Sequence, residues 1–166
     1  MDNKYCLKYK HNFKKRINND LKLFDNYNNL ILDKLEEKNV DNKYFIFIYL
    51  KINKIKYLFK LKHDYPFSAP EILINIENKY TDYYEYLFDL YCFYKNKINT
   101  NHITCPCCFN LLCNYNLNYK LVNFIDEIIK YNKLIMQLSN KYFGLLILNK
   151  KNNLNDYINS YIIEYL

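Results

Sequence analysis

The chain has 166 residues, a formal net charge of +7 and a hydrophobic content of 51%. This length suits one domain covering residues 1–166, and this composition is not that of a disordered protein. Gly144 is the only glycine, which excludes the glycine-rich phosphate loops of kinases, P-loop proteins and Rossmann domains. With only three histidines, a histidine-based metal centre or a serine triad is also disfavoured. We therefore expect a function without a cofactor or a bound metal.

The positive charge is spread along the chain. Basic residues concentrate only at positions 8–16 and 150–151, and no nucleic-acid-binding motif accompanies them, so we expect no nucleic-acid partner. No apolar run reaches the roughly 20 residues of a membrane-spanning helix, and residues 1–5 do not form an apolar signal region. These observations predict a soluble intracellular protein without a membrane partner, located in the cytoplasm or in both cytoplasm and nucleus.

The first half of the chain is predicted to form a helix and then an antiparallel meander. Apolar residues spaced by three and four over residues 8–24 indicate an amphipathic helix with one basic face. Strand-like runs follow at residues 30–32, 44–52, 55–61 and 72–76, which makes four strands. Asn53 and Lys54 form a two-residue hairpin signal between the second and third runs.

A proline corner joins the third and fourth of these strands. Pro66 and Pro70 each fix their own φ and push the preceding residue toward extended conformations, so the connection is stiff and not helical. Such a corner can present Phe67 to a partner. Alternatively, Phe67 plugs the edge of the core.

The second half of the chain is predicted to be helical around an irregular loop. The tyrosine-rich residues 79–97 have helix-like spacing and predict an inserted helix, and the polar residues 99–118 contain four cysteines. Further helices are predicted at residues 121–129, continuing weakly toward residue 136, and at residues 154–166. Strands followed by helices predict an α+β domain.

This order of elements resembles the layout of ubiquitin-conjugating enzymes, and three stretches match motifs of that family. Residues 15–23 resemble its first helix, in which a Lys-Arg pair and an acidic-Leu pair recur. Residues 64–70, Asp-Tyr-Pro-Phe-Ser-Ala-Pro, are close to its Tyr-Pro-Phe-x-x-Pro corner, and residues 108–112, Cys-Phe-Asn-Leu-Leu, are similar to its active-site run. The resemblance implies a divergent member that carries ubiquitin or a ubiquitin-like modifier as a cysteine thioester and transfers it to an amine.

The resemblance also implies site residues in the cysteine loop. Cys108 is the expected nucleophile by its register with the motif, while Cys105 and Cys107 remain open as alternatives. The family has a His-Pro-Asn triplet before its cysteine, and its asparagine supports the oxyanion. This sequence lacks the triplet, so Asn101 or His102 would take that role.

Partner contacts follow from the same resemblance. Lys14, Lys15 and Arg16 on the first helix would contact an activating enzyme, and Phe67 at the corner would contact a ligase. The basic helix face equally suits an ordinary solvated surface. The modifier itself would be the third partner.

Two other interpretations remain open, so the sequence leaves undecided whether the chain is an enzyme. One is a catalytically inactive conjugating-enzyme variant or an RWD-like protein-binding module of the same fold class. The other is a zinc-binding or dithiol redox domain, because Cys105, Cys107 and Cys108 lie near Cys113 and together offer four thiolates. Disulfides are not expected, since no secretory signal is present.

Overall fold

The computed structural model describes residues 3–40, 43–98, 106 and 110–151. Its elements follow in the order α1 (Asn3–Leu21), the 3-10 helix η1 (Lys22–Asn26), β1 (Leu30–Val40), β2 (Lys43–Ile52), β3 (Ile55–Lys62), β4 (Glu71–Ile76), β5 (Lys79–Asp82), α2 (Tyr83–Ile98) and α3 (Leu121–Lys151). The described residues therefore form an α+β fold that begins with a helix and ends in helices, as expected from the sequence.

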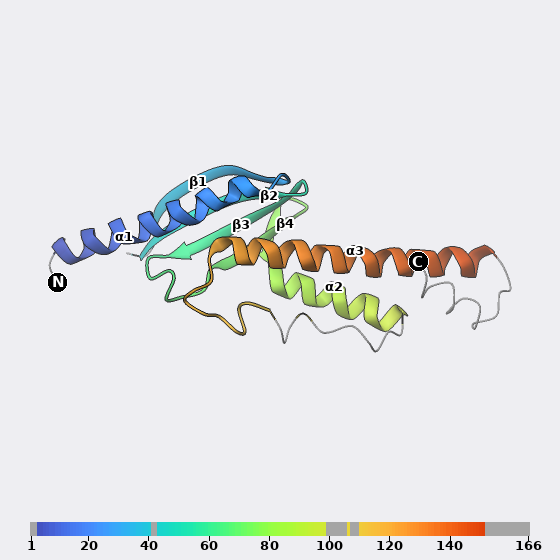
Figure 1. Cartoon of the computed structure of the whole chain (residues 1–166). Helices are drawn as coiled ribbons and strands as arrows, with labels where there is room; N and C mark the ends of the chain where they lie inside the picture. Colours follow the sequence, from blue (N-terminus) through green and yellow to red (C-terminus); the bar gives the residue numbers. More distant parts are fainter. Residues whose placement is uncertain (1–2, 41–42, 99–105, 107–109, 152–166) are drawn as a thin grey trace.

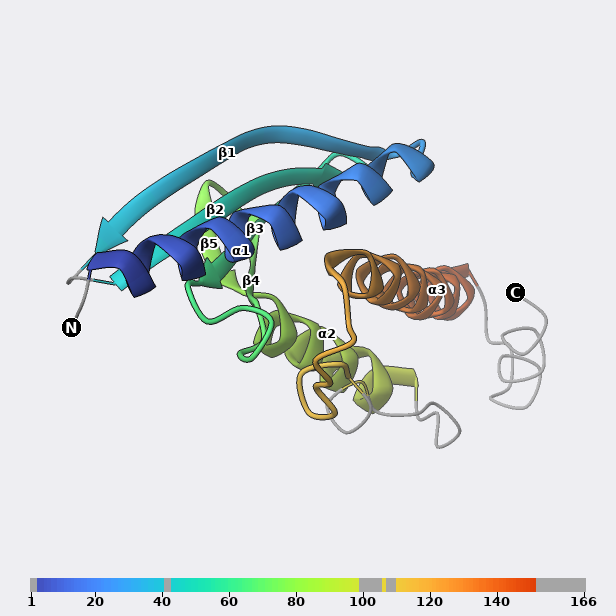
Figure 2. The same cartoon turned by 60° about the vertical axis from the view of Figure 1, so that its left-hand side comes forward.

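The five strands form one antiparallel sheet in the order β1-β2-β3-β4-β5, so each strand pairs with the next along the chain. Inward-facing residues of the sheet, such as Ile48, Phe59 and Ile72, share one buried cluster with Ile17 of α1 and Phe124 of α3. Helices α1 and α3 lie near the sheet, and α2 runs beside α3 (Figures 1 and 2). Burying each such side chain contributes about 1.5–3 kcal/mol, so this layer between sheet and helices is the main source of stability.

The turn between β2 and β3 is the predicted two-residue hairpin. Ile52 and Ile55 are paired across the strands, and the two residues between them have positive φ, 49° at Asn53 and 71° at Lys54. Positive φ at both central positions is the pattern of a type I′ turn, whose twist matches that of the flanking strands. Asparagine tolerates this conformation, whereas lysine is strained by it.

Replacing Lys54 with glycine is therefore expected to stabilise the protein by about 0.5–1 kcal/mol, since glycine adopts positive φ without a Cβ clash. Urea unfolding followed by circular dichroism measures the change. The matched control is Lys54→Ala, which removes the same charged side chain but keeps the Cβ. An equal gain in both variants would show that lost charge, and not backbone strain, accounts for the effect.

Strand β1 is much longer than the three residues predicted for it. It extends to Val40, with a register shift between Leu32 and Lys34, and most of its residues are exposed. Glu36 forms ion pairs with both Lys34 and Lys38. An edge strand of this kind lacks the apolar alternation that reveals a half-buried strand, and its charges suit an uncovered edge. The prediction from hydrophobic residues therefore stopped at residue 32, although the strand continues to Val40.

The prediction of four strands is wrong, and the helix predicted over residues 79–97 is confirmed only from Tyr83 onward. Residues Lys79–Asp82 form a fifth strand, β5, after a tight turn at Glu77 and Asn78, and the helix begins only at Tyr83. The side chain of Asp82 accepts hydrogen bonds from the backbone N–H of Tyr84 and of Glu85, at 2.9 and 3.0 Å. Asp82 is thus the N-cap that sets the start of α2.

Helix α3 also exceeds its prediction, because it continues past residue 136 as one helix to Lys151. It projects beyond the sheet, with α2 running beside it (Figure 1). The predicted N-terminal helix is shifted as well, since α1 begins at Asn3 and the chain tightens into η1 after Leu21. The helix predicted at residues 154–166 lies outside the described residues. Among the described helices, none has the length and apolar character needed to cross a membrane.

Candidate functional site

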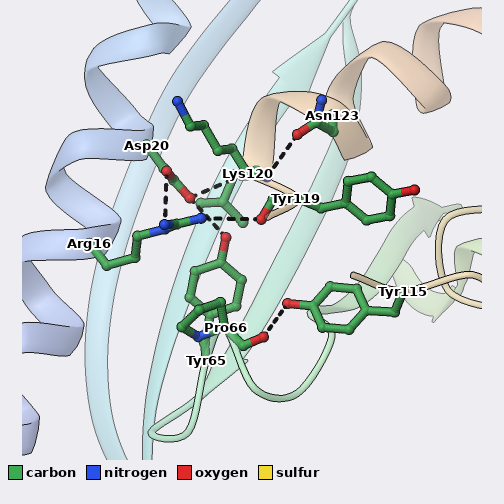
Figure 3. Close-up of polar contacts among 9 residues, drawn as sticks. Arg16, Asp20, Tyr65, Pro66, Tyr115, Tyr119, Lys120 and Asn123 are labelled. Carbon is green, nitrogen blue, oxygen red and sulfur yellow. Dashed lines mark hydrogen bonds and ion pairs between the residues drawn. The ribbon is translucent and has the colours of Figure 1, made fainter. Parts of the chain in front are cut away.

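A buried carboxylate, Asp20 of α1, contacts two distant parts of the chain, the proline corner and the start of α3. Its side chain is only 2% exposed. It accepts a hydrogen bond from the hydroxyl of Tyr65 in the proline corner at 2.8 Å, and another from the backbone N–H of Leu121 at 3.3 Å. Leu121 is the first residue of α3, where backbone N–H groups lack helical partners and negative charge is favourable. Asp20 therefore ties α1 to the corner and to the start of α3 (Figure 3).

Arg16 completes this cluster from one turn earlier in α1. Its Nε lies 3.6 Å from a carboxylate oxygen of Asp20, and its NH2 group donates to the carbonyl of Tyr119 at 3.4 Å. Burial, and then the charge of Asp20, raise the pKa of the Tyr65 hydroxyl far above its ordinary value, so Tyr65 remains a hydrogen-bond donor. The cluster is thus a charged anchor in which the Asp20 carboxylate and the Tyr65 hydroxyl are hydrogen-bonded to each other, while the buried Nε of Arg16 lies at ion-pair distance from Asp20 without a hydrogen bond among the described residues.

The three basic residues predicted to contact an activating enzyme differ in their surroundings. Arg16 is turned toward Asp20 and Tyr119, and Lys14 pairs with Glu37 of β1 at 2.6 Å. Lys15 is exposed. Two of the three cations are therefore engaged within the chain, and Lys15 offers the most open positive charge of the set.

The proline corner is hydrogen-bonded to the C-terminal part of the cysteine-containing loop. The hydroxyl of Tyr115 donates to the carbonyl of Pro66 at 2.6 Å, so the corner and this segment are held side by side (Figure 3). The next residue, Phe67, is 73% exposed, and its backbone N–H donates to the carbonyl of Asp64 at 2.7 Å. Phe67 therefore does not plug the core and instead presents its ring on a fixed backbone.

The predicted nucleophile and oxyanion residues, Cys108, Asn101 and His102, lie outside the described residues, as do Cys105 and Cys107. Their described neighbours are anchored. Pro106 and Asn110 are buried, and the side-chain oxygen of Asn110 accepts a hydrogen bond from the backbone N–H of Cys113 at 2.8 Å. Asn110, two residues after Cys108, is therefore held by its burial and by this hydrogen bond.

A second buried carboxylate, Glu127 of α3, holds this segment. One oxygen accepts the backbone N–H of Leu111 at 2.8 Å, and the other accepts the hydroxyl of Tyr84 on α2 at 2.5 Å. Burial raises the pKa of Glu127 above its ordinary value, while the bonds from Tyr84 and Leu111 oppose that rise. Burial is also the first cause of a raised pKa at Tyr84. Glu127 thus links α2, α3 and the residue three positions after Cys108.

Sequence reasoning missed the roles of Asp20, Glu127 and Tyr115. Each carboxylate lies within or beside an apolar helical stripe, Asp20 before Leu21 and Glu127 between Phe124 and Ile128. An acid in such a stripe was the available signal, because a buried charge requires specific partners. Tyr115 offered no comparable signal, since its partner is a backbone carbonyl distant in sequence.

Within the described part of the chain, no group of three or more His, Cys, Asp or Glu side chains is arranged to hold a metal ion. The thiolates proposed for the zinc alternative lie mostly outside that part. Searches of protein-family models, of curated proteins and of solved structures each returned no match for this chain.

Proposed function

We propose that the chain acts as a ubiquitin-conjugating-like carrier, in which the thiolate of Cys108 accepts the C-terminal carboxyl group of ubiquitin or a ubiquitin-like modifier as a thioester and passes it to an amine. The activating enzyme supplies the modifier as a thioester, so the exchange of one thioester for another needs no metal or nucleotide at this site. The thiol of the activating enzyme is the leaving group of this exchange. Attack by the amine on the thioester of Cys108 then regenerates the Cys108 thiol.

One observation supports this proposal: the proline corner is hydrogen-bonded to Tyr115, which follows the run of residues 108–112 by three positions. Tyr115 bonds the Tyr-Pro corner to the segment after Cys108, and Glu127 fixes Leu111 in that same segment. A nucleophile on a surface loop gains from a fixed backbone beside it, because the attacking atom must be held in reach of its target. The exposed Phe67 ring lies next to this arrangement and suits a ligase contact.

The test is a charging assay with activating enzyme, ATP and a panel of modifiers, read as a reductant-sensitive adduct on a gel. We expect the parent chain to form such an adduct and Cys108→Ser to form none that a reductant removes. Cys113→Ser is the matched control, because Cys113 lies nearby in the same region and is exposed, and it should charge like the parent. Equal charging of Cys108→Ser, or no charging with any modifier, would contradict the mechanism.

A second candidate is a protein-binding module of the same fold class that does not transfer a modifier. The observation that favours it is the corner itself, where Phe67 is 73% exposed on a backbone fixed by Asp64 and Tyr115. This surface is complete without any cysteine. Binding of a modifier or ligase that survives Cys108→Ser but is lost in Phe67→Ala, together with no charging of the parent, would establish this candidate instead.

A further inference from the structure

A groove of about 1100 Å³ is lined by α2, α3 and the β2–β3 and β4–β5 turns. The two helices run in the same direction away from the sheet (Figure 1). Close to the sheet, the ring of Tyr83 lies 5.7 Å from that of Tyr57 in β3, and its hydroxyl donates to the carbonyl of Ile128 at 3.5 Å. Farther out, the rings of Tyr94 and Tyr142 are 5.9 Å apart. The groove therefore has an inner end at the sheet and an outer end along the helices.

The inner end of this groove is cationic. The side chain of Asn132 in α3 donates to the hydroxyl of Tyr57 at 2.7 Å, so this part of α3 lies against the start of β3. The residues next to this pair, Lys133 and Lys56, both line the groove, and Lys54 of the β2–β3 turn lines it with them. All three lysines are exposed. Within the described part of the chain, none of them forms an ion pair.

One carboxylate accompanies these three cations. Glu77 of the β4–β5 turn is the only acidic residue among the described residues of the lining, and it is exposed. The three lysines outnumber it, so the inner end keeps an excess of positive charge. An anionic group is therefore favoured there.

The outer end of the groove is apolar. It is formed by Leu90 of α2 and by Ile135 and Met136 of α3, with Tyr94 beside them. The side chain of Met136 is 59% exposed, so apolar surface is open to the solvent at this end. Apolar walls with a few polar groups at one place are the usual lining of a small-molecule site, in which the polar groups fix the orientation of the ligand.

The separation of charge along the groove selects one kind of occupant. Between Tyr83 and Tyr94, α2 rises by about 16 Å, and between Asn132 and Ser139, α3 rises by about 10 Å. A ligand with its charge at one end and an extended apolar chain of this length matches both ends. An amphipathic helix instead carries its polar residues along its outer side. A second copy of this chain, whose net charge is +7, would bring a basic protein against the lysines.

We propose that the α2–α3 groove binds a single-chain amphiphile with an anionic head, of the class of long-chain carboxylates, as a monomer from solution. The carboxylate lies among Lys54, Lys56 and Lys133, and the alkyl chain extends outward over Leu90 and Met136. Burial of the methylene groups supplies affinity, and the unpaired lysines fix which end enters. The site uses no cysteine, so it is independent of the thioester chemistry proposed for Cys108.

The test is a calorimetric titration of the full-length chain with dodecanoate, kept below its micelle concentration. We expect saturable binding in an equimolar ratio. Dodecyltrimethylammonium has the same alkyl chain and a cationic head, and it should bind at least about tenfold more weakly, because its charge meets the lysines with the wrong sign. Equal binding of the two amphiphiles would overturn the proposal.

Two pairs of variants test the two ends of the groove. Lys56→Glu should weaken dodecanoate binding about tenfold by turning an attraction into a repulsion, whereas Lys62→Glu, exposed at the other end of the same strand and outside the lining, should leave it unchanged. Met136→Asp should weaken binding by a similar factor, because it puts a charge beside the alkyl chain. Its control is Gln137→Asp, exposed and outside the lining. Circular dichroism checks that each variant is folded.

Other occupants give different results in the same experiments. Equal weakening by Lys56→Glu and Lys62→Glu would show that net charge, and not the groove, attracts dodecanoate. Cosedimentation with phosphatidylglycerol vesicles without binding of free dodecanoate would assign the lysines to a membrane surface. A dimer in light scattering that Met136→Asp dissociates, without dodecanoate binding, would assign the groove to a second copy. Each of these three results would overturn the proposal.

Discussion

Replacing Asp20 with alanine is expected to lower the free energy of unfolding by about 3–5 kcal/mol, the usual cost of removing one partner of a buried ion pair. The change leaves the half-buried guanidinium of Arg16 beside an empty site and removes the acceptor of Tyr65. It also leaves the first N–H of α3, at Leu121, without its acceptor. Urea unfolding followed by circular dichroism measures the loss.

The matched control for Asp20 is Asp25→Ala, five residues further along and exposed. It should change the free energy of unfolding by no more than about 0.5 kcal/mol. Tyr65→Phe deletes only the hydroxyl and should cost about 1.5–3 kcal/mol, since the lost hydrogen bond is to a charged group. In a double-mutant cycle the two losses should be less than additive. Additive losses, or an Asp20→Ala effect as small as the control, would disprove the anchor.

Glu127→Ala is expected to destabilise the protein by about 2–4 kcal/mol, because two partly buried donors lose their buried acceptor and each costs about 1–3 kcal/mol when unpaired. These donors are the hydroxyl of Tyr84 and the backbone N–H of Leu111. Glu127→Gln keeps the shape and one acceptor oxygen and should cost less. Glu85→Ala, on the exposed side of α2, is the control and should cost no more than about 1 kcal/mol. An equal loss in the alanine and glutamine variants would contradict the role assigned to the acceptor.

The raised pKa of Glu127 also predicts a pH dependence of stability. Because burial raises the pKa above the ordinary value of 4.5, the folded chain holds this proton to a higher pH than the unfolded chain does. Between the two pKa values the folded state binds more protons, so the contribution of Glu127 to stability falls as pH rises through that window. Urea titrations from pH 4.5 upward should show this decline in the parent and a smaller one in Glu127→Gln. Identical slopes of unfolding free energy against pH in the parent and in Glu127→Gln would rule out this contribution of Glu127.

Local patterns were sufficient for the meander from β2 to β4. Alternating apolar residues in β2 and the Asn53-Lys54 turn each act between neighbours in sequence, and both were read correctly. The proline corner was recognised for the same reason, since Pro66 and Pro70 restrict their own backbone. Its contact with Tyr115 was not foreseen, because a hydroxyl can reach any backbone carbonyl that the fold brings near.

The ends of elements were harder to predict than their presence. Strand β1 continues through charged residues because pairing with β2 satisfies its backbone, whatever its side chains are. The boundary between β5 and α2 depends on the side chain of Asp82, which caps the helix. The helix-like spacing over residues 79–97 concealed both strand β5 and the start of α2 at Tyr83, since tyrosines suit a strand as well as a helix.

The sequence by itself determined the α+β class, the order of helix, strands and helices, and a proline corner ahead of a cysteine loop. These follow from periodicity and from backbone restrictions, which act over a few residues. Only the tertiary structure decided that Asp20 and Glu127 are buried anchors, that Arg16 turns inward and that Phe67 faces outward. Each of these depends on segments many positions apart, such as Asp20 and Leu121. A buried charge is stable only where such distant partners meet it, so no local pattern was able to specify the anchor.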